Sequence, residues 1–213
     1  MLKKNKWTLA VTTLVVLLPI LVGVILWDKL PEMIATHWGV NGEPDGWSKK
    51  SSAVFGLPIF LCAIHWVCNW ATAQDKKNRA QSDKIMALTL WICPVISVGV
   101  HAAVYAEALG KSFNAMIILP ILLGLLFVFI GNLLPKCRQN STIGIKVKWT
   151  LENEANWNAT HRMAGKLWVI GGAFLLLCVF LPEAVLPWVV LSVITVMVVV
   201  PTVYSYRYSK KNP

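Results

Sequence analysis

Charged residues are scarce in this sequence, and acidic residues are the scarcest of them. Only 14% of the 213 residues are charged, whereas about 25% are charged in an average soluble domain. Only 10 are Asp or Glu, against 20 Lys or Arg, so the net charge is +10. The basic residues lie in the gaps between apolar segments and not along one stripe. This pattern argues against direct nucleic-acid binding and favours contact with the anionic headgroups of membrane lipids.

Motifs for hydrolysis and for metal or nucleotide binding are missing as well. The chain contains no G-x-S-x-G, no H-E-x-x-H and no phosphate-binding loop. The five cysteines have no zinc-ribbon spacing, and their odd number argues against a disulfide framework. We expect them to be small apolar core residues. The sequence therefore predicts no catalytic residue, no metal site and no cofactor, and it favours a protein that is not an enzyme.

What the sequence does contain is long apolar runs. Hydrophobic residues make up 56% of the chain, and a helix needs roughly 20 mostly apolar residues to cross a bilayer. The first run is too long for the apolar core of a signal peptide, so we interpret it as a retained helix. Six such segments are predicted, at about 7–27, 53–73, 85–106, 115–134, 164–181 and 184–206. The fold class is therefore all-α: a polytopic membrane protein with six transmembrane helices, forming one membrane domain over 1–213.

The basic residues also predict the orientation of these helices. Sixteen of the 20 Lys and Arg lie in the two termini and in the gaps at 74–84 and 135–166. Cytoplasmic loops carry an excess of Lys and Arg, so these segments are expected inside. Both the N-terminus and the C-terminus are then cytoplasmic, in the bacterial cell membrane.

This orientation divides the single domain into two parts. Residues 1–134 form an N-terminal four-helix part, whose loop at 28–52 is extracellular. Residues 135–213 form a C-terminal part, in which a cytoplasmic loop at 135–163 precedes two helices.

The outer loop combines turn sequences with two tryptophans. Asn41-Gly42 and Pro44-Asp45-Gly46 are typical of turns, and Trp38 and Trp47 suit the headgroup zone. A compact loop packed on the membrane surface would explain them, and a weak metal site of His37 with Asp45 or Glu43 is a further alternative. The sharper hypothesis is a ligand-binding surface, formed by His37, Trp38, Asn41, Gly42, Pro44, Asp45 and Trp47.

The inner loop predicts an additional helix. Pro135 should stop the fourth span, and Thr150 can cap a new helix whose face includes Trp157 and His161. We expect this helix to lie along the inner membrane surface and to turn into the fifth span near Gly165. It is either an interfacial anchor with its tryptophans in the headgroups or a partner-binding site. The candidate residues are Pro135, Asn140, Gly144, Trp149, Thr150, Trp157, Thr160, His161 and Arg162.

Two histidines, His65 and His101, lie inside predicted spans. Neither has an acidic residue at helical spacing in its own span. An ionisable residue within a membrane is a functional hypothesis by default, so a proton or ligand role competes with neutral, hydrogen-bonded packing.

Both unusual loops resemble one known family. The outer loop, from Leu30-Pro31 through Thr36-His37-Trp38 to Asn41–Trp47 and Lys49, is similar to the extracytoplasmic motif of a domain of unknown function at the N-terminus of SdpI-type proteins. The inner loop resembles the hallmark of the same family, and the resemblance covers roughly 7–206. Its matching residues are Gly131-Asn132, Leu134-Pro135-Lys136, Asn140, Gly144-Ile145-Lys146, Trp149-Thr150-Leu151, Trp157, Thr160-His161-Arg162 and Gly165-Lys166. Lys148 departs from the pattern, because Pro is expected before the Trp-Thr pair, and Lys146 stands where Arg is common.

The resemblance implies an immunity protein that protects its producer from a secreted peptide toxin acting on the membrane potential. It also raises the hypothesis of a signalling receptor that holds a cytoplasmic transcriptional repressor at the membrane. The expected partners are therefore a secreted peptide toxin, a repressor and membrane lipids. Two alternatives stay open: a small-solute or lipid transporter, favoured by His65 and His101, and a metal-dependent membrane enzyme using His37 with Asp45, or His161.

Overall fold

The computed structural model describes residues 5–111 and 115–212, and within them it confirms the six-helix prediction. All six helices are long and apolar enough to cross a membrane. They are α1 (Lys6–Ile25), α2 (Leu57–Gln74), α3 (Asp83–Ala108), α4 (Ala115–Leu133), α6 (Glu154–Leu177) and α7 (Leu186–Lys211), with a short α5 (Lys148–Glu152) before α6. Short 3-10 turns lie at Trp27–Lys29, Lys76–Ala80, Leu134–Lys136, Cys178–Phe180 and Glu183–Val185, and a π-helical turn at Ser52–Gly56.

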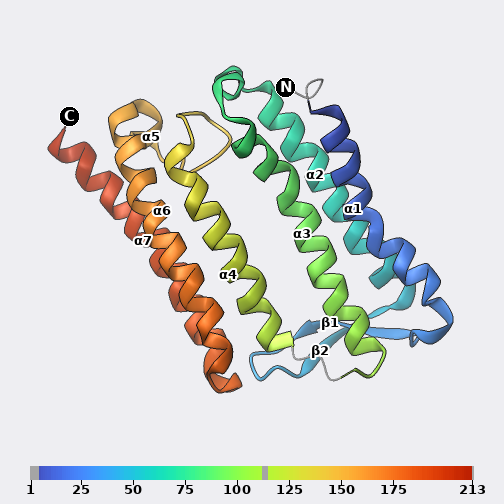
Figure 1. Cartoon of the computed structure of the whole chain (residues 1–213). Coiled ribbons are helices and arrows are strands. Elements are labelled where there is room, and N and C mark those ends of the chain that lie inside the picture. Colours follow the sequence, from blue (N-terminus) through green and yellow to red (C-terminus); the bar gives the residue numbers. More distant parts are fainter. Residues whose placement is uncertain (1–4, 112–114, 213) are drawn as a thin grey trace.

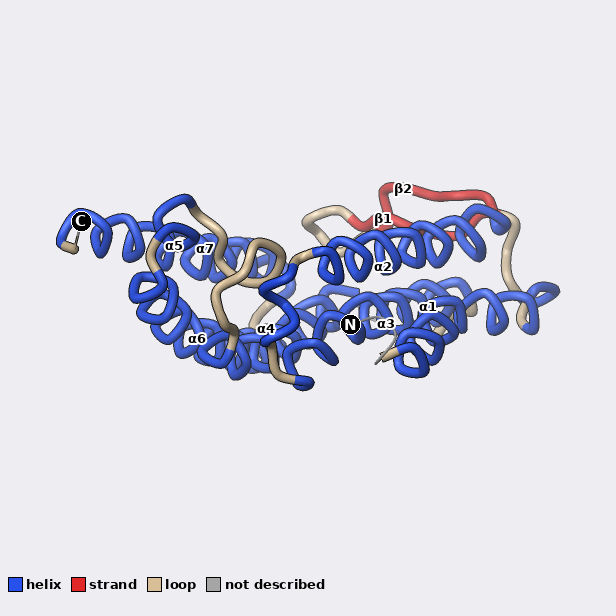
Figure 2. Tube along the Cα trace, turned by 90° about the horizontal axis from the view of Figure 1, so that it is seen from above, coloured by secondary structure: helices blue, strands red, loops and turns tan. Residues whose placement is uncertain are grey.

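The helices form an elongated bundle with two different ends. The start of α1 and the end of α7 lie at the same end, together with α5 (Figure 1). A two-stranded hairpin covers the opposite end of α1–α3. Seen along the bundle, α1–α3 form one group, and α4, α6 and α7 lie beside them as a second (Figure 2). Large apolar side chains such as Leu14, Phe129 and Ile170 are exposed on the outer faces, as expected of a multi-pass membrane protein.

The hairpin was not predicted from the sequence. Strands β1 (Met33–Trp38) and β2 (Pro44–Lys49) pair antiparallel, with Ile34 opposite Ser48 and Ala35 opposite Trp47. Only the Asn41-Gly42 turn is confirmed, since Gly42 has the positive φ of 79° that glycine tolerates. The second expected turn, Pro44-Asp45-Gly46, is wrong, because these residues begin β2 and Gly46 pairs with His37.

Burial under the hairpin explains why it is ordered. Ile34 is buried in a cluster with Leu30, Val54, Val104 and Tyr105, which joins β1 to the π-helical turn before α2 and to the end of α3. A two-stranded hairpin alone is marginal in water, so this apolar contact provides the stability that the strand pairing lacks.

Polar side chains link α1 to its neighbours inside the first group. The Ser97 hydroxyl of α3 donates to the Val16 carbonyl at 2.8 Å, and the Tyr105 hydroxyl donates to the Pro19 carbonyl at 2.9 Å. On the other side, His65 Nε2 of α2 lies 3.2 Å from the Thr12 hydroxyl. Without a hydrophobic driving force between helices in lipid, such bonds help to hold the group together.

In the second group, α4 and α6 approach through paired glycines. A Cβ added to Gly124 would lie 2.8 Å from the Gly172 carbonyl oxygen, and one added to Gly172 would lie 2.6 Å from that of Gly124. The pair Gly131 and Gly165 repeats the arrangement. Small residues at such positions let two helix backbones pack closely in a membrane.

The fifth span differs from its prediction. Helix α6 begins at Glu154 and continues through Gly165 without a turn, so Trp157 and His161 belong to the helix of the fifth span itself and not to a separate surface helix. The side chain of Asn153, and not Thr150, caps it by accepting a hydrogen bond from the Asn156 N–H at 2.9 Å. The prediction that Pro135 stops the fourth span is confirmed, because α4 ends at Leu133 and Pro135 lies in the 3-10 turn that follows.

Candidate functional site

The exposed tip of the hairpin carries most of the residues predicted for the outer site. His37 Nδ1 and Asp45 Oδ1 form a hydrogen bond between β1 and β2, and both side chains are more than half exposed. The Asn41 amide donates to the Glu43 carboxylate at 3.1 Å across the turn. Trp47 is exposed, whereas Trp38 is half-buried against the cluster under β1. Gly42 and Pro44 shape the turn and the start of β2 and do not form a surface of their own.

This surface offers hydrogen-bonding groups and an exposed indole, but no third ligand for a metal. Among residues 5–111 and 115–212, no group of three or more His, Cys, Asp or Glu side chains lies close enough to hold an ion. The His37–Asp45 pair is instead bonded to itself. The arrangement is suited to recognising a polar or amphipathic ligand through side-chain contacts.

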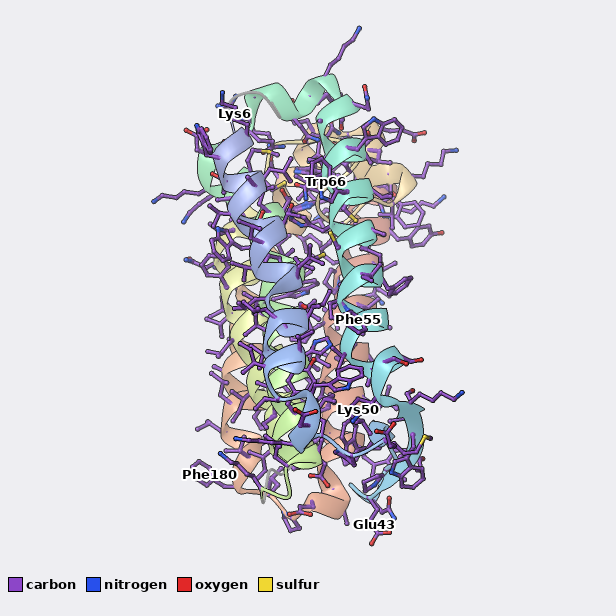
Figure 3. The ribbon with its side chains drawn as sticks, turned by 90° about the vertical axis from the view of Figure 1, so that its right-hand side faces the viewer. Lys6, Glu43, Lys50, Phe55, Trp66 and Phe180 are labelled. Carbon is purple, nitrogen blue, oxygen red and sulfur yellow. The ribbon has the colours of Figure 1, made fainter. Side chains whose placement is uncertain are left out.

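A buried lysine that sequence reasoning missed anchors the base of the hairpin (Figure 3). Lys50 donates from Nζ to the backbone carbonyls of Trp27 at 3.2 Å and Leu30 at 3.1 Å. It also pairs with Glu32 at 2.9 Å and lies over the Trp27 ring. A buried ammonium needs such partners. Its only sequence signal was its position, directly after β2 and before an apolar run.

At the opposite end, Asn140 organises the loop between α4 and α5. Its side-chain oxygen accepts from the N–H groups of Thr142 at 2.8 Å and Ile143 at 2.6 Å. Its amide donates to the carbonyls of Arg138 and Ile143, each at 2.9 Å. Asn140 is buried, so it fixes the shape of the loop and does not present itself to a partner.

Trp157 and His161 form the floor under this loop. The two rings stack with centroids 3.9 Å apart, and Trp157 Nε1 donates to the Cys137 carbonyl at 2.8 Å. His161 Nδ1 donates to the Trp157 carbonyl at 2.9 Å, while Nε2 accepts from the Ile145 N–H at 3.0 Å. One ring nitrogen therefore donates and the other accepts, which is the pattern of a neutral imidazole.

Gly144 fits against that floor for a steric reason. Its φ of 109° lies in the region that favours glycine, and an added Cβ would collide with His161 Nε2. The thiol of Cys137, beside the loop, is also buried. Burial raises the pKa of Cys137 to about 11, and the hydrogen bond from Asn140 opposes that shift only in part.

Thr150 and Trp149 join α5 to its surroundings. The Thr150 hydroxyl donates to the Ile145 carbonyl at 2.8 Å and accepts from the Val147 N–H at 3.1 Å, so it closes the loop. Trp149 Nε1 donates to the Ser205 hydroxyl of α7 at 2.6 Å. Thr160 donates to Asn156, and the Asn156 amide reaches the Ser205 carbonyl, each at 2.9 Å. These bonds tie α5, α6 and α7 together.

The loop between α2 and α3 docks onto the same structure. Asp75 Oδ2 accepts from both the N–H and the hydroxyl of Ser141 at 2.8 Å. Gln81 donates to the Arg138 carbonyl at 2.6 Å and accepts from the Arg138 N–H at 3.0 Å. Asn78 donates to the Thr142 hydroxyl at 2.6 Å.

Sequence reasoning missed these three residues, although a signal was present. Asp75, Asn78 and Gln81 are spaced by three, and a 3-10 helix has three residues per turn, so the turn at Lys76–Ala80 brings them to one face. Burial disfavours the charge on Asp75, but the bonds from Ser141 and the N–H of Lys77 outweigh it. They hold the pKa of Asp75 below its ordinary value.

The candidate residues of the inner loop therefore have two different environments. Asn140, Thr150, Trp157, Thr160 and His161 are buried, so the expectation that Trp157 lies in the headgroup zone is wrong. Arg162 is exposed and, with Lys166, Tyr204 and Tyr208, lines a groove between α6 and α7. The residues of this groove are exposed and can contact a partner or a lipid headgroup directly. The buried residues instead hold the loop between α4 and α5 in position.

The two histidines within the spans also differ from each other. Both ring nitrogens of His65 have partners, because Asn69 donates to Nδ1 at 3.3 Å and Nε2 meets Thr12. His101 Nδ1 donates to the Ser97 carbonyl at 2.8 Å. These contacts favour neutral packing for His65.

Comparison with known proteins gives matches over both halves of the chain. Residues 136–205 match the model of the SdpI/YfhL protein family, and residues 14–62 match a domain of unknown function, DUF1648. The chain is 25% identical to the immunity protein SdpI of Bacillus subtilis (strain 168), over 99% of this chain and 98% of that protein. No solved structure shows significant similarity. The resemblance predicted from the two loops is confirmed.

Proposed function

We propose that this chain, which is similar to SdpI-type membrane proteins, protects the bacterial cell from a secreted, membrane-active peptide toxin. The observation that carries the proposal is the similarity to an immunity protein over nearly the full length of both chains. The ordered, exposed hairpin supports it further, because a protein that meets a toxin from outside needs a preformed surface in reach of it.

In this proposal the hairpin end faces outward and the end with α5 faces the cytoplasm. The concentration of Lys and Arg in the segments at the α5 end supports that orientation. His37, Asn41, Asp45 and Trp47 then contact the toxin directly, and Trp38, Gly42 and Pro44 hold them in place. The exposed indole and the polar pair suit a peptide that is itself amphipathic.

A second, finer proposal concerns the cytoplasmic end. The groove with Arg162 and Lys166 is the exposed part of the family hallmark and could hold a cytoplasmic repressor or an anionic lipid headgroup. Within the described residues, neither cation forms an ion pair with a carboxylate, so both are available to such a partner. Asn140, Trp157 and His161 act here by positioning the neighbouring loop.

The test of immunity is the survival of toxin-sensitive cells that express the chain. The cells are challenged with a titration of SDP-type peptide, the class of secreted toxin from which SdpI-type proteins are named. A variant with reversed charges in the basic segments serves as the topology control. We expect the wild-type chain to raise the lethal dose and the control to lose this effect. Unchanged sensitivity with the wild-type protein well expressed and inserted would reject immunity to this peptide.

A further inference from the structure

A cavity of about 370 Å³ lies directly beneath the hairpin. Such a volume is within the range of ligand pockets, about 300–1,000 Å³. Its walls are apolar and come from α2 and α3, with Leu57, Phe60 and Val104 among them. The hydroxyls of Thr36 and Ser48, bonded to each other across the two strands, border it on the hairpin side. The cavity is therefore bordered by the hairpin on one side and by α2, α3 and the turn before α2 on the others.

His101 provides a polar group in this apolar cavity. The side chain is buried, and its Nδ1 is already used as the donor to the Ser97 carbonyl. Nε2 is itself buried and has no hydrogen-bond partner among the described residues. The backbone of Ala53 also lies within electrostatic reach of the ring. In a neutral imidazole the second nitrogen is an acceptor. A buried acceptor without a donor costs free energy that a ligand can recover.

The backbone around the cavity is unusual on the same side. Ser52–Gly56 forms a π-helical turn, a rare conformation that occurs mostly as single turns and is frequent at functional sites. Gly56 lines the cavity, and a Cβ added there would meet nothing within 4 Å. The turn thus leaves open space at the wall of the cavity that His101 also lines.

We propose that this cavity is the binding pocket for the toxin and takes one of its aromatic side chains that ends in a hydrogen-bond donor. Phe60, Leu57 and Val104 would contact the ring, and the N–H or O–H at its edge would donate to His101 Nε2. Tryptophan and tyrosine have this combination of an apolar body and a polar group. The inference rests on the proposed immunity function. In it, the toxin contacts the hairpin tip and also enters the cavity below the hairpin.

Four variants in the survival assay test the pocket. His101→Phe keeps an aromatic ring but removes the acceptor, and His101→Gln restores an acceptor. Gly56→Phe fills the cavity from its wall, and Gly56→Ala is the matched control, since a Cβ at this position points into open space. Membrane levels of each variant are measured alongside, so that a folding defect is recognised.

We expect His101→Phe and Gly56→Phe to lower the tolerated toxin dose about tenfold, the effect of losing roughly one buried hydrogen bond or a comparable contact. His101→Gln and Gly56→Ala should stay within about threefold of wild type. Wild-type protection that survives in Gly56→Phe and His101→Phe would overturn the pocket but leave immunity intact. If the well-expressed wild-type chain itself gave no protection, the proposed function would be rejected instead. If His101→Phe fails to insert, Gly56→Phe decides.

Discussion

Gly131 of α4 and Gly165 of α6 face each other so closely that a Cβ on Gly131 would lie 2.8 Å from the Gly165 carbonyl oxygen, and one on Gly165 2.7 Å from that of Gly131. A Cβ on Gly165 would also meet the ring of Pro135, which lies in the turn directly after α4. The two glycines and the proline thus set the distance between α4 and α6 at the end where the Asn140 loop begins.

Replacing Gly165 with Ala should therefore destabilise the protein. The added methyl group has to push backbone apart, and we expect a loss of about 1–3 kcal/mol of unfolding free energy. Thermal unfolding of the purified protein in detergent measures the effect as a lower Tm. Gly56→Ala, placed in open space, is the control and should leave the Tm unchanged. Equal Tm values for both variants would mean that α4 and α6 separate easily.

The thiol of Cys137 should report whether the Asn140 loop is closed. It is buried with a pKa of about 11, so a maleimide reagent should react with it slowly at neutral pH. The measurement uses a variant in which Cys137 is the only cysteine. His161→Phe removes the acceptor for the Ile145 N–H and should increase the labelling rate at least about tenfold. Fast labelling before any substitution would contradict a closed loop.

The bonds of Asp75 to Ser141 predict a pH dependence. These bonds lower the pKa of Asp75 in the folded protein. The contribution of Asp75 to folding stability is therefore fully present above the unfolded pKa of about 3.9, and it is lost as the pH falls through the folded pKa. The stability difference between wild type and Asp75→Ala should thus be constant from about pH 7 to pH 5 and shrink below about pH 4. Asp75 is only partly buried, so the difference should be below about 1 kcal/mol. A stability difference between wild type and Asp75→Ala that grows as the pH falls would contradict a lowered pKa of Asp75 in the folded protein.

Substitutions at the hairpin tip should affect function and not folding. The His37–Asp45 pair is exposed, and exposed ion pairs contribute about 0–1 kcal/mol. We expect His37→Ala and Trp47→Ala to leave the Tm within a few degrees while lowering the tolerated toxin dose. Lys49→Ala, on the same strand, is the control for general effects on β2. Full protection by both tip variants would remove the tip from the toxin-binding surface.

The membrane spans could be predicted from the sequence because their signal is local. An apolar run long enough to cross a bilayer rarely occurs in a soluble domain, and the predicted ends fall close to those of α1, α3 and α4. The fifth span, α6, begins earlier than predicted. Its first turns carry buried polar residues such as Asn156 and Thr160, whose hydrogen-bond partners are present only in the folded bundle. Composition alone made them look like a surface helix.

The sites were less predictable because they depend on contacts between distant segments. The hairpin is polar and short, and its order comes from Ile34 packing on α3 and on the π-helical turn before α2. The inner motif was identified correctly as special, but burial decides that Trp157 and His161 support the loop while Arg162 faces outward. The unpaired, buried Nε2 of His101 follows from the packing of the folded helices and could not be found in the sequence.

The bonds from Asp75, Asn78 and Gln81 to the Asn140 loop cross between the two helix groups, although the chain itself passes from one to the other between α3 and α4. The attachment of the groups is thus independent of the covalent link. A gene cut between α3 and α4 and expressed as two separate polypeptides should consequently give a protein that reassembles in the membrane.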